Sequence, residues 1–262
     1  MEVIPIKLSA KTTDFTTQFP DPIKLNKNRK YEVAFTSLDT YNSIPNITSE
    51  NNNFTYSSDD GKTWKTIKLR KGAYNIEQIN GEIQRQMILS GDYDDKKNLL
   101  FINISTFTLL SVIEISHPSY QIKFDVENSI GSLLGFDKEF LLYGYHQSSN
   151  IVNIMHVTSI LVNIDIIRSS YVNGIRAKAI HSFSPGVGPG HKIRERAQPE
   201  LIFCSINSSD IDNIRIWLTD EENNPIDLQG EEITVGILIR EGTHIKEEFK
   251  NAVKELKNEN SL

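Results

Sequence analysis

The feature that most constrains the fold is a series of about a dozen short runs of β-branched and aromatic residues, separated by turn-forming clusters. Val, Ile, Thr, Tyr and Phe fit the pleated surface of a β-sheet, whereas Asn, Asp, Gly, Ser and Pro favour turns. The pattern therefore predicts an all-β protein. The predicted strands cover residues 3–8, 31–38, 54–57, 63–69, 99–104, 109–115, 120–126, 151–167, 177–183, 201–206, 211–218 and 232–239.

The last two of these runs suggest how part of a sheet is built. Ile214, Ile216 and Leu218 alternate with more polar residues, so they would share one face of a strand. Residues 232–239 are more continuously apolar, which is typical of a strand buried on both faces. A polar turn, residues 219–225, separates the two runs. We expect them to be antiparallel partners in one sheet.

Two segments have helical periodicity instead. In residues 75–89, Asn75 can cap a helix whose apolar residues recur every three or four positions. In the C-terminal tail, residues 241–262, a second apolar stripe is surrounded by Lys and Glu. The second helix has two open arrangements, either packed on its own domain or laid onto a neighbouring subunit. The stripes are Ile76, Ile79, Ile83 and Met87 in the first segment and Ile245, Phe249, Val253 and Leu256 in the second.

The expected organisation is one antiparallel β-sandwich over residues 1–240, followed by the helical tail, residues 241–262. The 262 residues suffice for one large β-sandwich or for two small domains, without disulfides or metal. No internal repeat or Gly/Ser-rich linker divides the chain. The best candidate boundary is the polar stretch 145–150, which could equally be one long loop within a single domain.

The net charge and the distribution of apolar residues bear on two kinds of partner, nucleic acids and membranes. The net charge is −6, and no segment concentrates Lys and Arg into a basic patch, which disfavours direct nucleic-acid binding. No apolar run approaches the length of a membrane span, and the first residues lack the pattern of a secretion signal. We therefore expect a chain that starts in the cytosol. Cys204 lies in an apolar run and is interpreted as a small core residue.

Residues 57–64 resemble the Ser-x-Asp-x-Gly-x-Thr-Trp box of sialidase-like β-propellers. The box is a folding device: Asp-Gly favours a tight hairpin, Ser and Asp can bond the turn backbone, and Trp packs beneath it. A propeller would show periodic copies, and only one copy is present. The segment therefore predicts a β-hairpin, and a glycoside hydrolase is only a third hypothesis.

No catalytic constellation emerges from the remaining motifs. The six histidines are scattered singly, without metal-ligand spacing. Gly61-Lys62-Thr63 lacks the earlier glycine of a phosphate loop, and no Gly-x-Ser-x-Gly elbow occurs. We therefore name no catalytic, cofactor-binding or metal-binding residue, expect no cofactor, and interpret the chain as a non-enzymatic structural protein.

Several phrases together resemble the jelly-roll capsid proteins of Polinton-like and adintovirus-like elements, particularly the smaller, penton-type minor capsid protein. The resemblance implies a single jelly roll that forms homopentamers at icosahedral vertices, beside a larger double-jelly-roll major capsid protein. It also implies a virion location, with synthesis in the host cytoplasm and assembly there or in the nucleus. The extra helix and strands would be insertions or a second small β-domain. The phrases are residues 41–46, 72–80, 133–136, 170–174, 216–220 and 226–231.

Both termini are predicted interface elements under this hypothesis. A strand at the N-terminus could pair with a neighbouring subunit, and the apolar stripe of the tail could pack on one. The predicted interface residues are Val3, Ile4, Ile6, Ile245, Phe249, Val253 and Leu256.

The alternative function is a glycan- or receptor-binding β-sandwich. It is motivated by the hairpin box and by four aromatic residues that could be exposed. The structural interpretation of the same residues is packing in a core or on a sheet. The four are Trp64, Tyr143, Tyr145 and Trp217.

Overall fold

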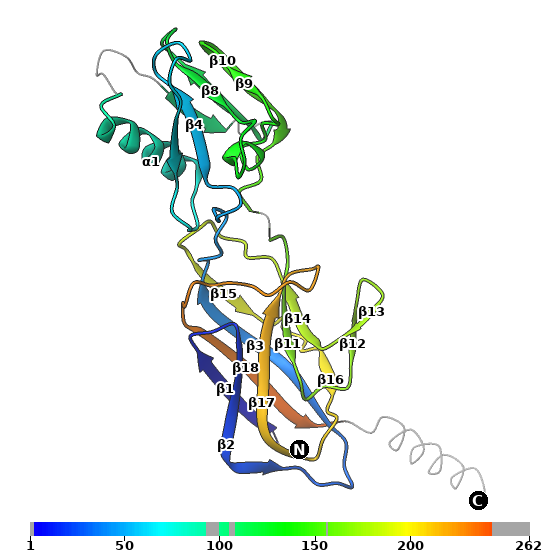
Figure 1. Cartoon of the computed structure of the whole chain (residues 1–262). Coiled ribbons are helices and arrows are strands. Elements are labelled where there is room, and N and C mark those ends of the chain that lie inside the picture. Colours follow the sequence, from blue (N-terminus) through cyan, green and yellow to red (C-terminus); the bar gives the residue numbers. More distant parts are fainter. Residues whose placement is uncertain (1–2, 93–99, 105–107, 156, 243–262) are drawn as a thin grey trace, which may run out of the picture.

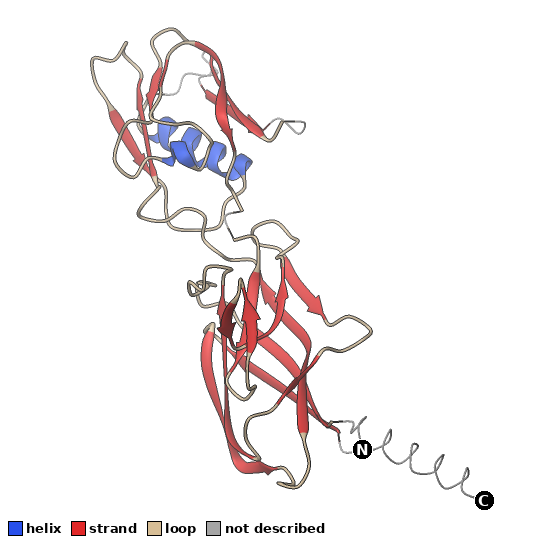
Figure 2. Ribbon diagram, turned by 90° about the vertical axis from the view of Figure 1, so that its right-hand side faces the viewer, coloured by secondary structure: helices blue, strands red, loops and turns tan. Residues whose placement is uncertain are grey.

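The computed structural model describes residues 3–92, 100–104, 108–155 and 157–242. Figure 1 shows two parts, one above the other, and Figure 2 shows that the lower part consists of strands while the upper part also contains an α-helix. We call the lower part the roll, residues 3–41 and 160–242. We call the upper part the inserted lobe, residues 42–159, because the chain enters it from the roll and returns to the roll afterwards.

The roll contains two antiparallel sheets. In the first sheet, β15 and β16 both pair with β3, and the order is β1, β18, β3 and then these two strands. In the second sheet the order is β14, β11, β17 and β2. The strands of the first sheet are β1 (Val3–Ala10), β3 (Tyr31–Tyr41), β15 (Lys192–Arg196), β16 (Phe203–Ser205) and β18 (Ile233–Glu241), and those of the second are β2 (Asp14–Lys24), β11 (Ile160–Ile164), β14 (Ala179–Phe183) and β17 (Asp210–Thr219).

The order of these strands is that of a jelly roll. Strand β15 pairs with residues 37–41 of β3 and β16 with residues 32–34, so the two occupy one position in the sheet. Counted as one strand, they make eight strands in all. In chain order, the first sheet then reads first, eighth, third, sixth, and the second reads fifth, fourth, seventh, second. This pairing of two Greek keys confirms the predicted antiparallel jelly-roll sandwich.

One core lies between the two sheets of the roll. Val33 and Ile239 contribute from the first sheet, and Ile164 and Ile214 from the second; each is completely buried. Burial of side chains of this size stabilises a fold by about 1.5–3 kcal/mol each, which is the main force that holds the sheets face to face.

The expected pairing of residues 211–218 with 232–239 is wrong. Strand β17 pairs with β2 and β11, whereas β18 pairs with β1 and β3, so the two lie in opposite sheets. Ile216 on β17 and Ile237 on β18 face the same core from its two sides. The apolar pattern gives the buried face of each strand, but it does not select the hydrogen-bonding partner.

The inserted lobe has its own hydrophobic cluster, which shares no buried residue with that of the roll. One sheet has the order β5, β4, β8, β9, and the other has the order β10, β7, β6. The prediction of one sandwich over residues 1–240, or of two small domains, stays a prediction. The elements are β4 (Asn53–Ser57), β5 (Lys65–Lys68), α1 (Ile76–Leu89), β6 (Leu100–Ile104), β7 (Leu110–Ile115), β8 (Gln121–Lys123), the 3-10 helix η1 (Ile130–Ser132), β9 (Phe140–Leu141) and β10 (Gly144–Ile151).

Helix α1 confirms the helix predicted near residues 75–89. The Asn75 side chain accepts a hydrogen bond from Gln78 N, and the Gln78 side chain accepts one from Asn75 N, which forms a capping box. The stripe of Ile76, Ile79, Ile83 and Met87 is buried. The predicted C-terminal helix lies outside the described residues.

The predicted strands leave out β2, β9, β12 (Ser170–Val172), β15, nearly all of β13 (Ile175–Ala177) and most of β10. Residues 145–150 form most of β10 rather than a boundary loop, and of residues 151–167 only 160–164 form a strand in addition to the end of β10. Strand β2 contains two prolines and β15 is mostly charged, so neither resembles a strand in sequence. Both are sheet edges, where prolines and charges are tolerated because one side of the backbone has no partner.

Candidate interaction surfaces

The jelly roll has two different side walls. Strands β1 and β2 are the edges of the two sheets on one side, and we call this surface the β1–β2 wall. Strand β14 and the β15/β16 position are the edges on the other side. Within the described residues, none of these edges pairs with a further strand. Each wall therefore offers backbone groups and side chains to another chain.

The β1–β2 wall contains the predicted interface residues of the N-terminus. Ile4 and Ile6 point inwards and pack partly against the core of the roll, whereas Val3 is 50% exposed. Pro5 and Lys7 lie with Val3 on the exposed face of β1. Of the three predicted residues, only Val3 therefore presents much of its side chain to a partner. Ile245, Phe249, Val253 and Leu256 lie outside the described residues.

The opposite side contains a cavity of about 660 Å³, which we call the β14 groove. Its walls are β14, the strand β12 (Ser170–Val172) and the segment 197–202; β12 forms a hairpin with β13 (Ile175–Ala177). Two large apolar side chains on the rim, Tyr171 and Ile202, are 74% and 73% exposed. Apolar surface of this kind is characteristic of a contact surface.

A stacked histidine forms the floor of the β14 groove. The His181 ring lies parallel to that of buried Phe35, with 4.1 Å between centroids, and His181 Nε2 lies 2.8 Å from Glu195 Oε1. Stacking and the carboxylate together fix the orientation of the imidazole ring.

The charges in the β14 groove are acidic. Glu200 and Glu221 line it, and within the described part of the chain no Lys or Arg does so. The Thr158 hydroxyl donates to Glu221 Oε1 and lowers the pKa of that carboxyl group, which therefore stays ionised at neutral pH. Sequence reasoning missed this groove, because its rim comes from segments far apart in the chain.

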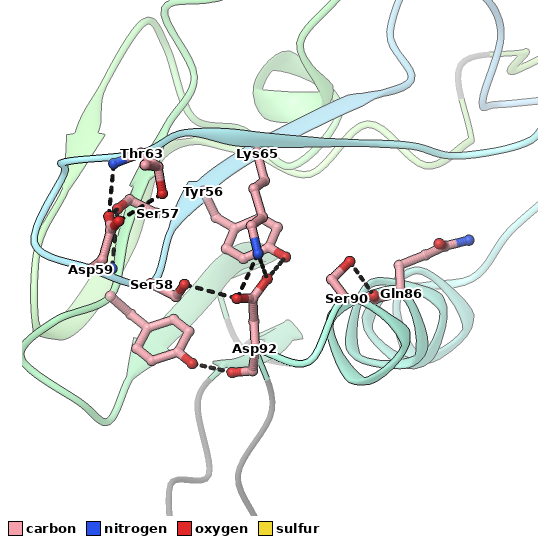
Figure 3. Close-up of polar contacts among 10 residues, drawn as sticks. Tyr56, Ser57, Ser58, Asp59, Thr63, Lys65, Gln86, Ser90 and Asp92 are labelled. Atoms are coloured by element: carbon pink, nitrogen blue, oxygen red, sulfur yellow. Dashed lines mark hydrogen bonds and ion pairs between the residues drawn. The ribbon is translucent and has the colours of Figure 1, made fainter.

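In the inserted lobe, Asp92 is the centre of a polar cluster (Figure 3). Its carboxylate, with a side chain only 9% exposed, accepts hydrogen bonds from Tyr56 (2.6 Å), Ser58 (2.9 Å) and Lys65 (2.7 and 2.8 Å). The Tyr120 hydroxyl donates to its backbone carbonyl. Asp92 follows the end of α1, so these bonds attach the helix to β4 and β5.

Acid is expected to weaken this attachment. Burial alone would raise the pKa of Asp92, but the bonds from Lys65, Tyr56 and Ser58 outweigh it and hold the pKa below its usual value. A carboxyl group whose pKa is lowered by folding stabilises the fold at pH values above its unfolded-state pKa, which is about 3.9. That stabilisation is lost as the pH falls through the folded-state pKa. We expect Asp92→Asn to lower the free energy of unfolding at pH 7 by about 1–3 kcal/mol. The difference from the wild type should shrink below about pH 4.

Urea unfolding between pH 7 and pH 3 measures this difference. Asp125→Asn is the control, because it removes the same charge from a side chain that is exposed. A gap between the Asp92→Asn variant and the wild type that is the same at pH 3 and pH 7 would contradict the assignment.

The predicted hairpin at residues 57–64 is confirmed. Strands β4 and β5 pair across it, the Ser57 hydroxyl accepts from Gly61 N (2.9 Å), and Asp59 accepts from both the amide and the hydroxyl of Thr63 (Figure 3). These bonds lower the pKa of Asp59 to about 2. Asp60 and Gly61 have φ of 59° and 77°, the left-handed conformation that Asp-Gly tolerates. The box is a structural device here, as predicted.

The four aromatic residues proposed for ligand binding differ in exposure. Tyr143 and Tyr145 are 59% and 67% exposed. Trp64 is half-buried, with its ring 5.7 Å from that of Phe140 and beneath the Lys123 ammonium group. Trp217 is also half-buried, beneath the Arg215 guanidinium group. Only the two tyrosines therefore present open ring surfaces.

The described residues contain no group of three or more His, Cys, Asp or Glu that could hold a metal ion. No helix among them is long and apolar enough to cross a membrane. Cys204 lies half-buried in β16, where burial raises the pKa of its thiol.

Comparison with known proteins identifies the fold. No protein-family model matches the sequence, and no curated protein is significantly similar to it. The structure is similar to the crystal structure of the mavirus penton protein, with a TM-score of 0.50 and 10% sequence identity. The match covers 92% of this chain and all of the penton chain. At this identity the likeness concerns the fold, and it agrees with the resemblance to penton-type jelly-roll proteins noted in the sequence.

Proposed function

We propose that this chain is a structural capsid protein, the penton-type subunit that oligomerises at icosahedral vertices. The observation that carries the proposal is the likeness to the mavirus penton protein, which extends along the whole of that chain. Such a protein needs surfaces for assembly and no reactive centre. Its partners would be further copies of itself and a double-jelly-roll major capsid protein, and its location would be the virion.

The two side walls of the roll support assembly into a ring. Contacts between unlike surfaces of identical subunits are heterologous, and they close into a ring when the rotation between neighbours allows it. The β1–β2 wall of one subunit would face the β14 side of the next.

Light scattering coupled to size-exclusion chromatography tests the proposal directly. A pentamer of this chain has a mass of about 149 kDa, five times 29.8 kDa. Electron microscopy of the same fraction should show five-fold rings. A chain that stays monomeric at all concentrations, alone and with a major capsid protein, would overturn the proposal.

A double substitution on the β1–β2 wall is expected to dissociate the pentamer without unfolding the chain. Val3→Asp combined with Lys7→Glu places like charge on the exposed face of β1, where neither side chain supports the core. Lys62→Glu, on the exposed hairpin of the inserted lobe, is the control. Pentamers that form equally well with the double substitution would exclude this wall as the interface, while leaving the capsid role intact.

A second function is favoured by the exposed apolar side chains of residues 140–145. Phe140, Leu142, Tyr143 and Tyr145 are 49% to 67% exposed on the inserted lobe. Glycans and receptor proteins are both commonly bound through such aromatic surfaces. Glycan-array binding that Tyr145→Ala abolishes would support a glycan ligand, and an array without binding would count against it.

A further inference from the structure

The β14 groove combines three properties of a docking surface. Its rim exposes the apolar side chains of Tyr171 and Ile202, its charged lining groups are the carboxylates of Glu200 and Glu221, and its wall includes the free edge of β14. An unpaired strand beside an apolar surface is a site at which other chains aggregate unless it is covered. A segment that covers this groove should therefore be apolar on one side and basic beside it.

The last described residues of the chain lie near one end of this groove, the end formed by Ile202. Gly242 N donates to Lys30 O (2.8 Å), and the Arg240 guanidinium group lies 3.3 Å from the Phe203 ring of β16. Gly242 and Ser205, at the end of β16, line the same small cavity. Ile202, on the rim of the groove, precedes Ser205 by three residues, which is about 10 Å along a strand. The tail therefore starts at the end of the roll nearer to Ile202, whereas Glu221 lies beyond the opposite end of β17.

The sequence of the tail matches the groove. Each residue of the apolar stripe, Ile245, Phe249, Val253 and Leu256, is followed directly by a lysine, the last of them Lys257, whereas Glu248 and Glu255 precede two of the four. In the helix that the spacing predicts, successive residues are about 100° apart, so the lysines form a row beside the apolar stripe. Residues 245–256 would span about 17 Å. The lysine row complements the carboxylates of Glu200 and Glu221.

We propose that the β14 groove is the docking site of the chain's own C-terminal segment, residues 245–256. The apolar stripe packs on Tyr171 and Ile202, and the lysine row lies along Glu200 and Glu221. Docking covers the free edge of β14 within each subunit, so in a ring the neighbouring β1–β2 wall would meet the docked tail and the β15/β16 edge. The inference depends on the groove and the tail alone, so it does not require that the protein be a capsid subunit.

Hydrogen exchange of the full-length chain tests the docking. Phe249→Asp removes the centre of the apolar stripe, and amides of residues 170–173 and 179–183 should then exchange about ten-fold faster. Asn251→Asp adds the same charge to the tail away from the stripe and should leave exchange in the groove unchanged. Ile202→Asp, on the groove side, should reproduce the effect of Phe249→Asp. Exchange that is the same in Phe249→Asp and in the wild type would overturn the proposal.

Cross-linking distinguishes a chain's own tail from that of a second copy. In a Cys204→Ser background, the pair Ile202→Cys and Phe249→Cys should form a disulfide under mild oxidation. The control pair, Ile151→Cys and Phe249→Cys, places the first cysteine on the inserted lobe. On a denaturing, non-reducing gel the cross-linked product should run as a single chain. Linked dimers, or a yield no higher than that of the control pair, would overturn docking within one chain.

Discussion

Gly135→Ala is expected to lower the free energy of unfolding by about 3 kcal/mol, of which strain supplies about 1–2 and overpacking the rest. Gly135 has φ of +79°, a conformation that residues with a Cβ rarely adopt. A Cβ at this position would also collide with the carbonyl group of Asn150, whose carbon would be 2.9 Å away. Asn150 cannot yield easily, because its amide donates to Gly135 O (3.0 Å) and thereby attaches β10 to the loop after η1.

Gly91→Ala separates the two contributions. Gly91 has a similar φ of +72°, but a Cβ there would have no neighbour within 4 Å. Its substitution should therefore cost only the backbone strain, about 1–2 kcal/mol. Urea unfolding of both variants measures the difference. Equal losses in the two variants would show that the close approach to Asn150 relaxes without cost.

Phe124→Ala should lower the free energy of unfolding by about 3–5 kcal/mol, the usual cost of removing a buried aromatic ring. Phe124 is 2% exposed at the centre of the inserted lobe, and its ring packs 5.3 Å from Phe136 and 6.3 Å from Phe54. A cavity at this point removes contacts from both neighbouring rings. Phe140→Ala is the control, since that side chain is 51% exposed and should cost less than about 1 kcal/mol.

The same variant tests whether the two parts of the molecule fold independently. The clusters of the roll and of the inserted lobe share no buried residue. In Phe124→Ala we expect faster hydrogen exchange in β4 and β8 and unchanged exchange in β17 and β18. A uniform increase over the whole chain would instead show that the roll and the lobe unfold as one cooperative unit.

Features that depend on neighbouring residues were predictable from the sequence. The cap and apolar stripe of α1, the hairpin at residues 57–64 and the inward face of β17 each follow from spacings within a few residues. The penton-type fold was also indicated by short phrases, and the structural likeness supports it. The edge strands β2 and β15 were not predictable, because an edge tolerates the prolines and charges that elsewhere end a strand.

The candidate surfaces depend on contacts between distant residues. Val3, Ile4 and Ile6 were all predicted to lie at an interface. The pairing of β1 with β18 turns Ile4 and Ile6 towards the core and leaves only Val3 exposed. Nothing near Asp92 in the sequence indicates that Tyr56, Ser58 and Lys65 converge on it. The β14 groove brings Phe35, Tyr171 and Ile202 together from three separate segments.

The sequence by itself determined most of the core strands, the helix α1 and the side chains that these elements bury, since periodicity and capping act over a single turn or pleat. The tertiary structure alone decided which strands share a sheet, which edges stay unpaired and where the groove lies. The reason is physical: β1 pairs with β18 across more than two hundred residues of chain. Any strand with the right buried face could fill that place, so the partner is selected by the packing of the whole core.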